Sequence, residues 1–321
     1  GIKWLDRLSN SKIDFMRGRF VGITVSAILS LAAIGLFFQP GLKYGIDFSG
    51  GTVMEVQAPD TNVEQLRKAL QDKGFTQAAI QEFGDNDYYI VRLPMEGAEQ
   101  VARGKGVESI KTTVTEISAD ASFPRVEMVG PKVSGDFRDA TILAIVFAGF
   151  GMLAYLWIRF EYHFALAATL TIGLDLTKTI GFFVLAGGEF NLTAVAALLA
   201  LIGYSVNDKV VVFDRVRENL RLTPDKPMLE LLNESITSTL TRTIFTSVTT
   251  FLALIPMAVA GGSAVASFAL PMLFGIVIGT SSSVFIAAPI VFWMGQQRLR
   301  KGLPQLRLSA EEMQKKLDAI M

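Results

Sequence analysis

Six apolar runs constrain the fold of this chain more than any other feature. A helix that crosses a bilayer needs about 18–20 consecutive, predominantly apolar residues. Half of the residues are hydrophobic and the mean hydropathy is +0.41, which is too high for an ordinary soluble chain of 321 residues. The sequence therefore predicts six transmembrane helices, at residues 20–38, 141–158, 164–186, 192–213, 235–260 and 267–294.

The basic residues between these runs predict their orientation. Lys and Arg lie before the first run, after the second, after the fourth and after the sixth, whereas the connections at 187–189 and 261–263 have none. Short loops rich in Lys and Arg stay on the cytoplasmic side of a membrane. We therefore expect both termini in the cytoplasm, and the long polar segment after the first run in a periplasm-like space.

Because no small-residue cleavage site follows the first run, we expect no cleavable signal peptide.

This topology divides the chain into five parts. The predicted parts are a cytoplasmic N-terminal segment at 1–19, transmembrane helix one at 20–38, a periplasmic domain at 39–138, transmembrane helices two to six at 139–297 with a cytoplasmic loop at 214–234, and a cytoplasmic tail at 298–321.

The periplasmic segment alternates between strand and helix patterns. Strands are predicted at 52–57, 79–83, 88–93 and 124–129, with a turn at 84–86, and helices at 62–73 and 96–120. Asn62 or Thr61 caps the first of these helices, and Gly74 ends it. The order β-α-β-β-α-β is the ferredoxin-like pattern. The expected fold is an all-α bundle of six transmembrane helices with an inserted α+β ferredoxin-like periplasmic domain.

Composition argues against several classes of function. The chain has no Cys and one His, His163, which excludes disulfides and thiolate metal sites and disfavours a His-based metal centre. Its 30 basic residues balance 30 acidic ones, so nothing suggests a nucleic-acid partner. We therefore expect no cofactor, no metal and no enzymatic activity.

Asp208 is the candidate functional residue that the apolar runs single out. An ionised Asp inside a membrane helix costs at least about 2.5–3.5 kcal/mol, so it usually faces a partner, a cavity or an ion path. Asp208 lies about 9 Å from the cytoplasmic end of the fourth run, and Arg242 about 10 Å from that of the fifth. This matched depth predicts an ion pair that a proton arriving on Asp208 would open. A purely structural ion pair is the alternative.

Tyr204, Ser205 and Asn207 lie within one turn of Asp208. Their side chains suit a proton path through ordered water, and equally well ordinary interhelical hydrogen bonds. Neither interpretation is favoured by the sequence.

The third run also carries charge. Asp175 and Lys178 are spaced i,i+3 and are able to pair with each other, and Asp175 is a further candidate for the polar layer. Lys209 follows Asp208 directly and therefore points to a different face, from which we expect it to snorkel to the interface. Beyond the fourth run, Asp214, Arg217 and Glu218 are expected to pair along a solvated helix face.

Four motifs occur in a fixed order along the chain. Together with the six runs and the single large polar segment, they resemble the SecF proteins of the SecD/SecF family, protein-export membrane components of the resistance-nodulation-division superfamily. The first motif contributes Gly45, Asp47, Phe48, Gly50, Gly51 and Thr52. The four are Tyr44-Gly-Ile-Asp-Phe-Ser-Gly-Gly-Thr52, Val129-Gly-Pro131, Ile202-Gly-Tyr-Ser-Val-Asn-Asp208 and Phe213-Asp-Arg-Val-Arg-Glu-Asn219.

The resemblance implies a function and partners. Proteins of this kind act with SecD, the SecYEG channel and often YajC in the bacterial inner membrane. There the proton gradient helps to pull unfolded preproteins out on the periplasmic side. Asp208 matches the family's fourth-span carboxylate, Arg242 its fifth-span arginine, and Asp175 a frequent third-span carboxylate.

The chain also departs from the family pattern. Leu174 stands where a His is frequent, and Lys178 and Lys209 are atypical. The principal proton-carrying carboxylate of the family is placed on SecD, so the resemblance implies a supporting role for Asp208. One alternative function is that of one half of a small-molecule transporter of the same superfamily, although such transporters usually have more spans and larger outer domains. The other alternative is a passive scaffold of the translocation channel.

Overall fold

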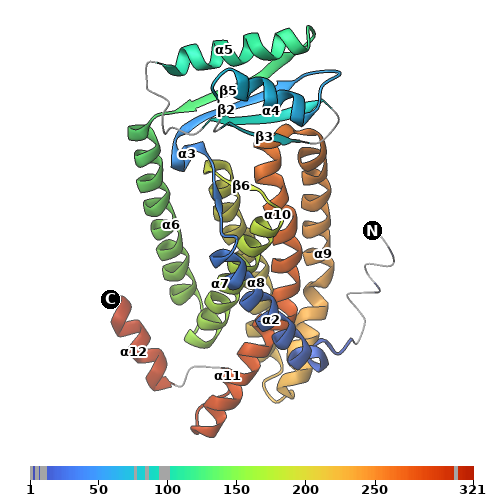
Figure 1. Cartoon of the computed structure of the whole chain (residues 1–321). Coiled ribbons are helices and arrows are strands. Elements are labelled where there is room, and N and C mark those ends of the chain that lie inside the picture. Colours follow the sequence, from blue (N-terminus) through green and yellow to red (C-terminus); the bar gives the residue numbers. More distant parts are fainter. Residues whose placement is uncertain are drawn as a thin grey trace.

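The protein is a bundle of long helices with a small α+β domain at one end (Figure 1). The computed structural model describes residues 3, 7, 13–75, 78–83, 87–93, 102–306 and 310–321. Within them, six helical segments are long and apolar enough to cross a membrane, which confirms the six predicted spans. They are α2 (Arg19–Phe38), α6 (Pro131–Arg159), α7 (Tyr162–Leu185), α8 (Leu192–Leu222), α9 (Met228–Ala260) and the segment Val265–Arg300.

The last span is built from three consecutive pieces. They are α10 (Gly262–Ser282), the π-helical turn η2 (Ser283–Ala287) and α11 (Ala288–Arg300). A short 3₁₀ turn, η1 (Phe15–Gly18), leads into α2, and α12 (Ala310–Ile320) follows α11 near the C-terminus. The π turn, which the sequence does not predict, makes no break in the helix.

Two helices extend further than their apolar runs. α6 begins at Pro131 rather than near residue 141, because Gly130 is its N-cap and proline suits the first helical position. α8 and α9 together absorb most of the predicted loop at 214–234, which leaves residues 223–227 between them. Pro224 and Pro227 lie in that link and are incompatible with a helix interior, so they set its position.

The α+β domain follows the predicted element order. It consists of β2 (Gly51–Gln57), α4 (Val63–Asp72), β3 (Ala79–Glu82), β4 (Tyr88–Leu93), α5 (Ala102–Ile117) and β5 (Ser122–Val129). The strands form an antiparallel sheet in the order β3-β4-β2-β5. Asn62 caps α4 as expected, since its side chain accepts a hydrogen bond from the Gln65 amide at 2.8 Å. The predicted turn at 84–86 and the start of the helix at 96–101 lie outside the described residues.

One face of the sheet packs against both helices of the domain. Met54 and Val56 of β2 are buried with Leu66 and Leu70 of α4 and Ile110 of α5. Alternate residues of a strand share a face, so Met54 and Val56 belong to the same apolar side. The domain therefore has a core of its own, separate from the core of the helix bundle.

The helices α2 and α7 cross at close range. A Cβ added to Gly181 would lie 2.4 Å from the Cβ of Ala33 and 2.7 Å from its Cα. Small residues at such crossings let two membrane helices approach closely, and the approach maximises dispersion contacts in the absence of a hydrophobic driving force. Gly181 therefore sets the spacing of the two helices.

We expect the substitution Gly181→Ala to destabilise the protein by about 1–3 kcal/mol, the usual cost of overpacking a core. Gly173→Ala is the matched control on the same helix, because no atom lies within 4 Å of its added Cβ. Unfolding of both variants in detergent micelles, titrated with a denaturing detergent, measures the difference. Equal stability of the two variants would contradict the assigned role of Gly181.

Candidate functional site

The interior of the bundle holds a buried ion pair between α7 and α8. Nζ of Lys209 lies 3.2 Å from Oδ2 of Asp175, and both side chains are almost fully buried. Ser205 and Ser282 each donate a hydrogen bond to the same Oδ2, at 2.9 Å and 2.8 Å. Nζ of Lys209 also lies 2.8 Å from the hydroxyl of Ser205 and 3.2 Å from the hydroxyl of Ser282. One carboxylate, one ammonium and two hydroxyls thus form a compact network.

This network corrects two expectations about the lysines. Asp175 pairs with Lys209 rather than with Lys178, and Lys209 is fully buried rather than snorkelling to the interface. The side chain of a helical residue leans toward the N-terminus, which carries Lys209 back over Ser205 and toward Asp175. Lys178 instead donates a hydrogen bond of 2.6 Å to the Ser26 hydroxyl of α2.

Asp208 lies at one end of a chain of hydroxyl groups. Its carboxylate accepts a long hydrogen bond, 3.5 Å, from Thr280 of α10, and only 2% of the residue is exposed. The Thr280 hydroxyl lies 2.7 Å from that of Ser247 on α9. Tyr204 of α8 in turn donates to Ser247 at 3.0 Å. Hydroxyl groups both donate and accept, so a chain of this kind is able to pass a proton along it.

Arg242 does not contact Asp208, which is a correction to the predicted ion pair. In the part of the chain that the structure describes, no ion pair joins these two residues, and Arg242 is exposed on the outer side of α9. Five residues separate Arg242 from the inward-facing Ser247, which corresponds to about 140° around a helix of 3.6 residues per turn. Matched depth along two helices therefore did not imply that the side chains face each other.

The other three predicted residues, Tyr204, Ser205 and Asn207, lie in different surroundings. Ser205 belongs to the Asp175 network and Tyr204 to the hydroxyl chain. Asn207 is exposed on α8 and belongs to neither. No sequence signal singles out Ser247, Thr280 and Ser282, because serine and threonine are common in these helices and their partners are distant in sequence.

The first motif ties the α+β domain to the far end of α8. Its Asp47 lies in α3 (Ile46–Ser49), a short helix just before β2, and accepts a hydrogen bond from the Leu192 amide at 3.0 Å. This amide is the first of α8, where backbone donors have no intrahelical partner and the helix dipole favours a carboxylate. Asp47 therefore caps the helix that carries Asp208.

A second contact lies beside the Asp47 cap. The strands β1 (Lys43–Tyr44) and β6 (Glu189–Phe190) pair in parallel, and the Gly45 amide donates to the Phe190 carbonyl at 2.9 Å. Arg92 of β4 forms an ion pair with Glu189. Burial raises the pKa of Glu189, and the Arg92 guanidinium opposes this shift. The domain is therefore joined to the bundle by charge, main-chain and capping contacts together.

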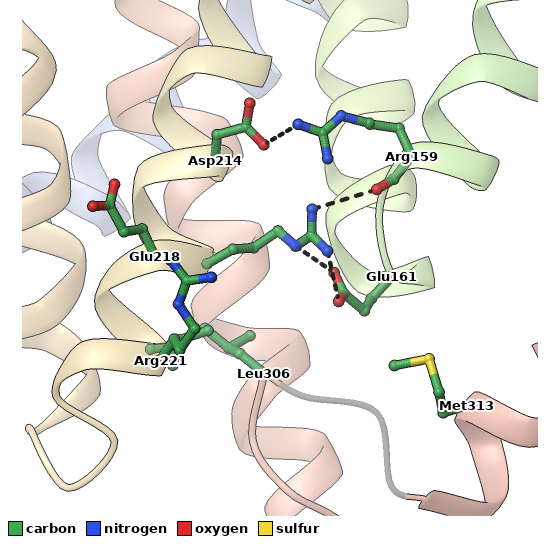
Figure 2. A pocket seen from close by; sticks show the side chains of 9 residues that line it. Arg159, Glu161, Asp214, Glu218, Arg221, Leu306 and Met313 are labelled. Atoms are coloured by element: carbon green, nitrogen blue, oxygen red, sulfur yellow. Dashed lines mark hydrogen bonds and ion pairs between the residues drawn. The ribbon is translucent and has the colours of Figure 1, made fainter.

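The opposite end of α8 is held by ion pairs across a cavity of about 600 Å³. Figure 2 shows Arg159, at the end of α6, reaching Asp214 of α8, and the two are 2.9 Å apart. Arg217 lies 3.2 Å from Glu161 in the α6–α7 connection. The expected pairing of Asp214 and Arg217 along their own helix is thus wrong, because both have partners on the neighbouring helix pair.

These features define a multi-pass membrane protein with a buried charge network and a capped link to an α+β domain. The family model for the C-terminal part of the protein-export membrane proteins SecD/SecF matches residues 109–297, and the SecD/SecF GG motif matches residues 35–58. The chain belongs to the SecD/SecF family. Its function is that of an accessory subunit of the Sec protein translocase.

Relatives of this family match the chain over most of its length. The protein translocase subunit SecF of Desulfurispirillum indicum is 38% identical over 96% of this chain and 99% of its own length. The subunit SecDF of Brucella abortus biovar 1 is 37% identical over 88% of this chain, which corresponds to 37% of its own length.

A solved structure shows the same architecture. The crystal structure of SecDF from Thermus thermophilus, described as a translocon-associated membrane protein, is similar with a TM-score of 0.79 and 34% identity. The match covers 88% of this chain and 39% of that one, so the chain spans less than half of the SecDF protein.

We expect Lys209→Met to destabilise the protein by about 3–5 kcal/mol, because it leaves the Asp175 carboxylate buried without its cation. The double variant Asp175→Asn, Lys209→Met removes both charges and should recover most of this loss. Lys178→Met should cost less than Lys209→Met, since Asp175 keeps its partner. Unfolding in micelles measures all three, and a double variant as unstable as Lys209→Met would contradict the pairing.

Proposed function

We propose that this subunit couples the proton gradient to late-stage preprotein export together with SecD. The observation that carries the proposal is the partly buried hydroxyl chain from Tyr204 through Ser247 and Thr280 to Asp208. Among the described residues, the buried Asp208 carboxylate accepts one long hydrogen bond, from Thr280. Its charged form is therefore costly, and protonation relieves that cost. A proton falling through about 150 mV supplies about 3.5 kcal/mol.

In this proposal α8 transmits the protonation event to the outer domain. Asp208 is sixteen residues beyond Leu192, which corresponds to about 24 Å along the helix. Asp47 caps the Leu192 end and directly precedes β2 of the α+β domain. A shift or rotation of α8 on protonation therefore moves a residue that is bonded to the domain.

In this proposal a partner subunit covers Arg242 and Asn207. Both are exposed on spanning helices, where an uncovered Arg against lipid is unfavourable. The SecDF relatives carry this region within a chain more than twice as long, which supports a SecD half as the partner. A carboxylate on SecD then interacts with Arg242, and Asp208 and Asp175 support that principal proton site.

The remaining assignments follow from the same proposal. The domain at 39–138 is a ferredoxin-like module on the periplasmic side of the bacterial inner membrane, where it meets unfolded preprotein. The antiparallel strand order β3-β4-β2-β5 supports this fold. Both termini lie in the cytoplasm, as the basic loops favour. The SecYEG channel, and YajC where present, are further partners, and the activity is transport rather than enzymatic.

Asp208→Asn and Arg242→Met should each abolish the gradient-dependent part of export while leaving assembly with SecD intact. The first removes the titrating group of the hydroxyl chain, and the second removes the cation proposed to pair with a carboxylate on SecD. Export of a preprotein from vesicles with and without a proton gradient measures the first property, and copurification with SecD measures the second. Normal gradient-dependent export by both variants would support a passive scaffold instead.

Ser247→Ala interrupts the hydroxyl chain and should lower the gradient-dependent export rate by about tenfold or more, as expected when a positioned proton-transfer group is lost. Thr246→Ala is the matched control on α9, because its exposed hydroxyl bonds the Arg242 carbonyl of its own helix. Export without a gradient should be unchanged in both variants. Equal gradient-dependent rates for the two would exclude the hydroxyl chain as the proton path.

A further inference from the structure

A groove of about 340 Å³ runs along the outside of the bundle between α2 and the last span. One face of α2 lines it from Gly18 to Leu29, and α10 and η2 form the other wall. Exposed apolar side chains form its mouth, among them Val21, Val25 and Phe285. Its floor is polar, because Lys178 and Ser26 line it and both are only 4% exposed.

Lys178 is a buried lysine that forms no ion pair with any residue that the structure describes. Its ammonium donates to the Ser26 hydroxyl, which satisfies one of three donors. The nearby Asp175 binds Lys209 through its Oδ2, and its Oδ1 is buried with no hydrogen-bond partner among the described residues. Intramembrane lysines usually pair with an anion or mark a functional path. Lys178 therefore has no ion-pair partner of its own within the described part of the chain.

The depth of Lys178 restricts where such an anion comes from. Lys178 is sixteen residues from Tyr162 and seven from Leu185, or about 24 Å and 10 Å from the two ends of α7. Lipid phosphates stay at the interface, so an anion at this depth is carried by a segment that spans the bilayer. The carboxylate of an Asp or Glu on a membrane helix meets this condition.

The walls of the groove suit helix side chains. They are apolar, and Gly18 leaves open space, since an added Cβ would have no atom within 4 Å. Gly22 is already used inside the chain, where an added Cβ would lie 2.7 Å from the Phe285 carbonyl oxygen of η2. π-helical turns are frequent at functional sites, and this one holds the second wall of the groove.

We propose that the groove receives a transmembrane helix of a partner subunit, and that an Asp or Glu of that helix pairs with Lys178. The surface belongs to α2, α7, α10 and η2, whereas the face proposed above for SecD belongs to α8 and α9. The proposal does not depend on proton coupling. Its chemical requirement is one acidic residue at the depth of Lys178 in an otherwise apolar span.

Cysteine cross-linking tests this pairing cleanly because the chain has no Cys. The probe is a synthetic peptide of about 21 Leu and Ala residues with one Glu about 10 Å from one end, to match the depth of Lys178, and one Cys a turn away. The full-length protein with Val25→Cys is reconstituted with it in liposomes, and a peptide with Gln in place of Glu is the comparison. We expect the Glu peptide to cross-link about tenfold faster, the upper range for one interhelical polar contact.

Lys178→Met, added to Val25→Cys, should reduce the rate for the Glu peptide to that of the Gln peptide. Thr246→Cys, beside the exposed Arg242, is the control site, where Lys178→Met should change nothing. Lys178→Glu should reverse the preference toward a peptide with Lys in place of the Glu, which shows that a folded protein still presents the groove. Equal rates for the Glu and Gln peptides at Val25→Cys, or no effect of Lys178→Met, would overturn the proposal.

Discussion

The ion pair between Asp175 and Lys209 is the interaction on which the interior of the bundle depends. It joins α7 to α8 in a region where both side chains are almost fully buried, and the hydroxyl of Ser282 adds the last span to the same contact. Breaking such a pair is far more costly than never having formed it, because the remaining charge keeps its full desolvation penalty. The pair therefore fixes the relative position of three helices and, with them, the hydroxyls around Asp208.

α8 is connected to its surroundings at three heights. Asp47 caps its first turn, Ser205 and Lys209 hold its middle, and Asp214 and Arg217 hold its C-terminal part. Each attachment uses a charged group, and each reaches a different part of the molecule. In the proposed mechanism, a change of charge in the middle of α8 moves the helix against the ion pairs at its C-terminal part. The same movement displaces the α+β domain, which is bonded to the first turn through Asp47.

Much of the fold follows from the sequence because its signals are local. Apolar length gives the six spans, and Asn62 gives the start of α4. The site is harder to predict, because spacing along a helix fixes the height of a residue but not the direction of its side chain. Arg242 has the height expected of a partner for Asp208 and points outward, while Lys209 turns back into the bundle. The Asp47–Leu192 contact joins residues 145 positions apart, so no local pattern reveals it.

The cap that Asp47 provides is made to a main-chain amide of α8, not to a side chain. Any residue other than proline at position 192 offers the same donor. The side chain there is free to change, for example to suit a bilayer of different thickness, while the joint between domain and helix stays in register. At Leu192, the main-chain amide thus keeps the domain joined to the helix, while the side chain is open to substitution.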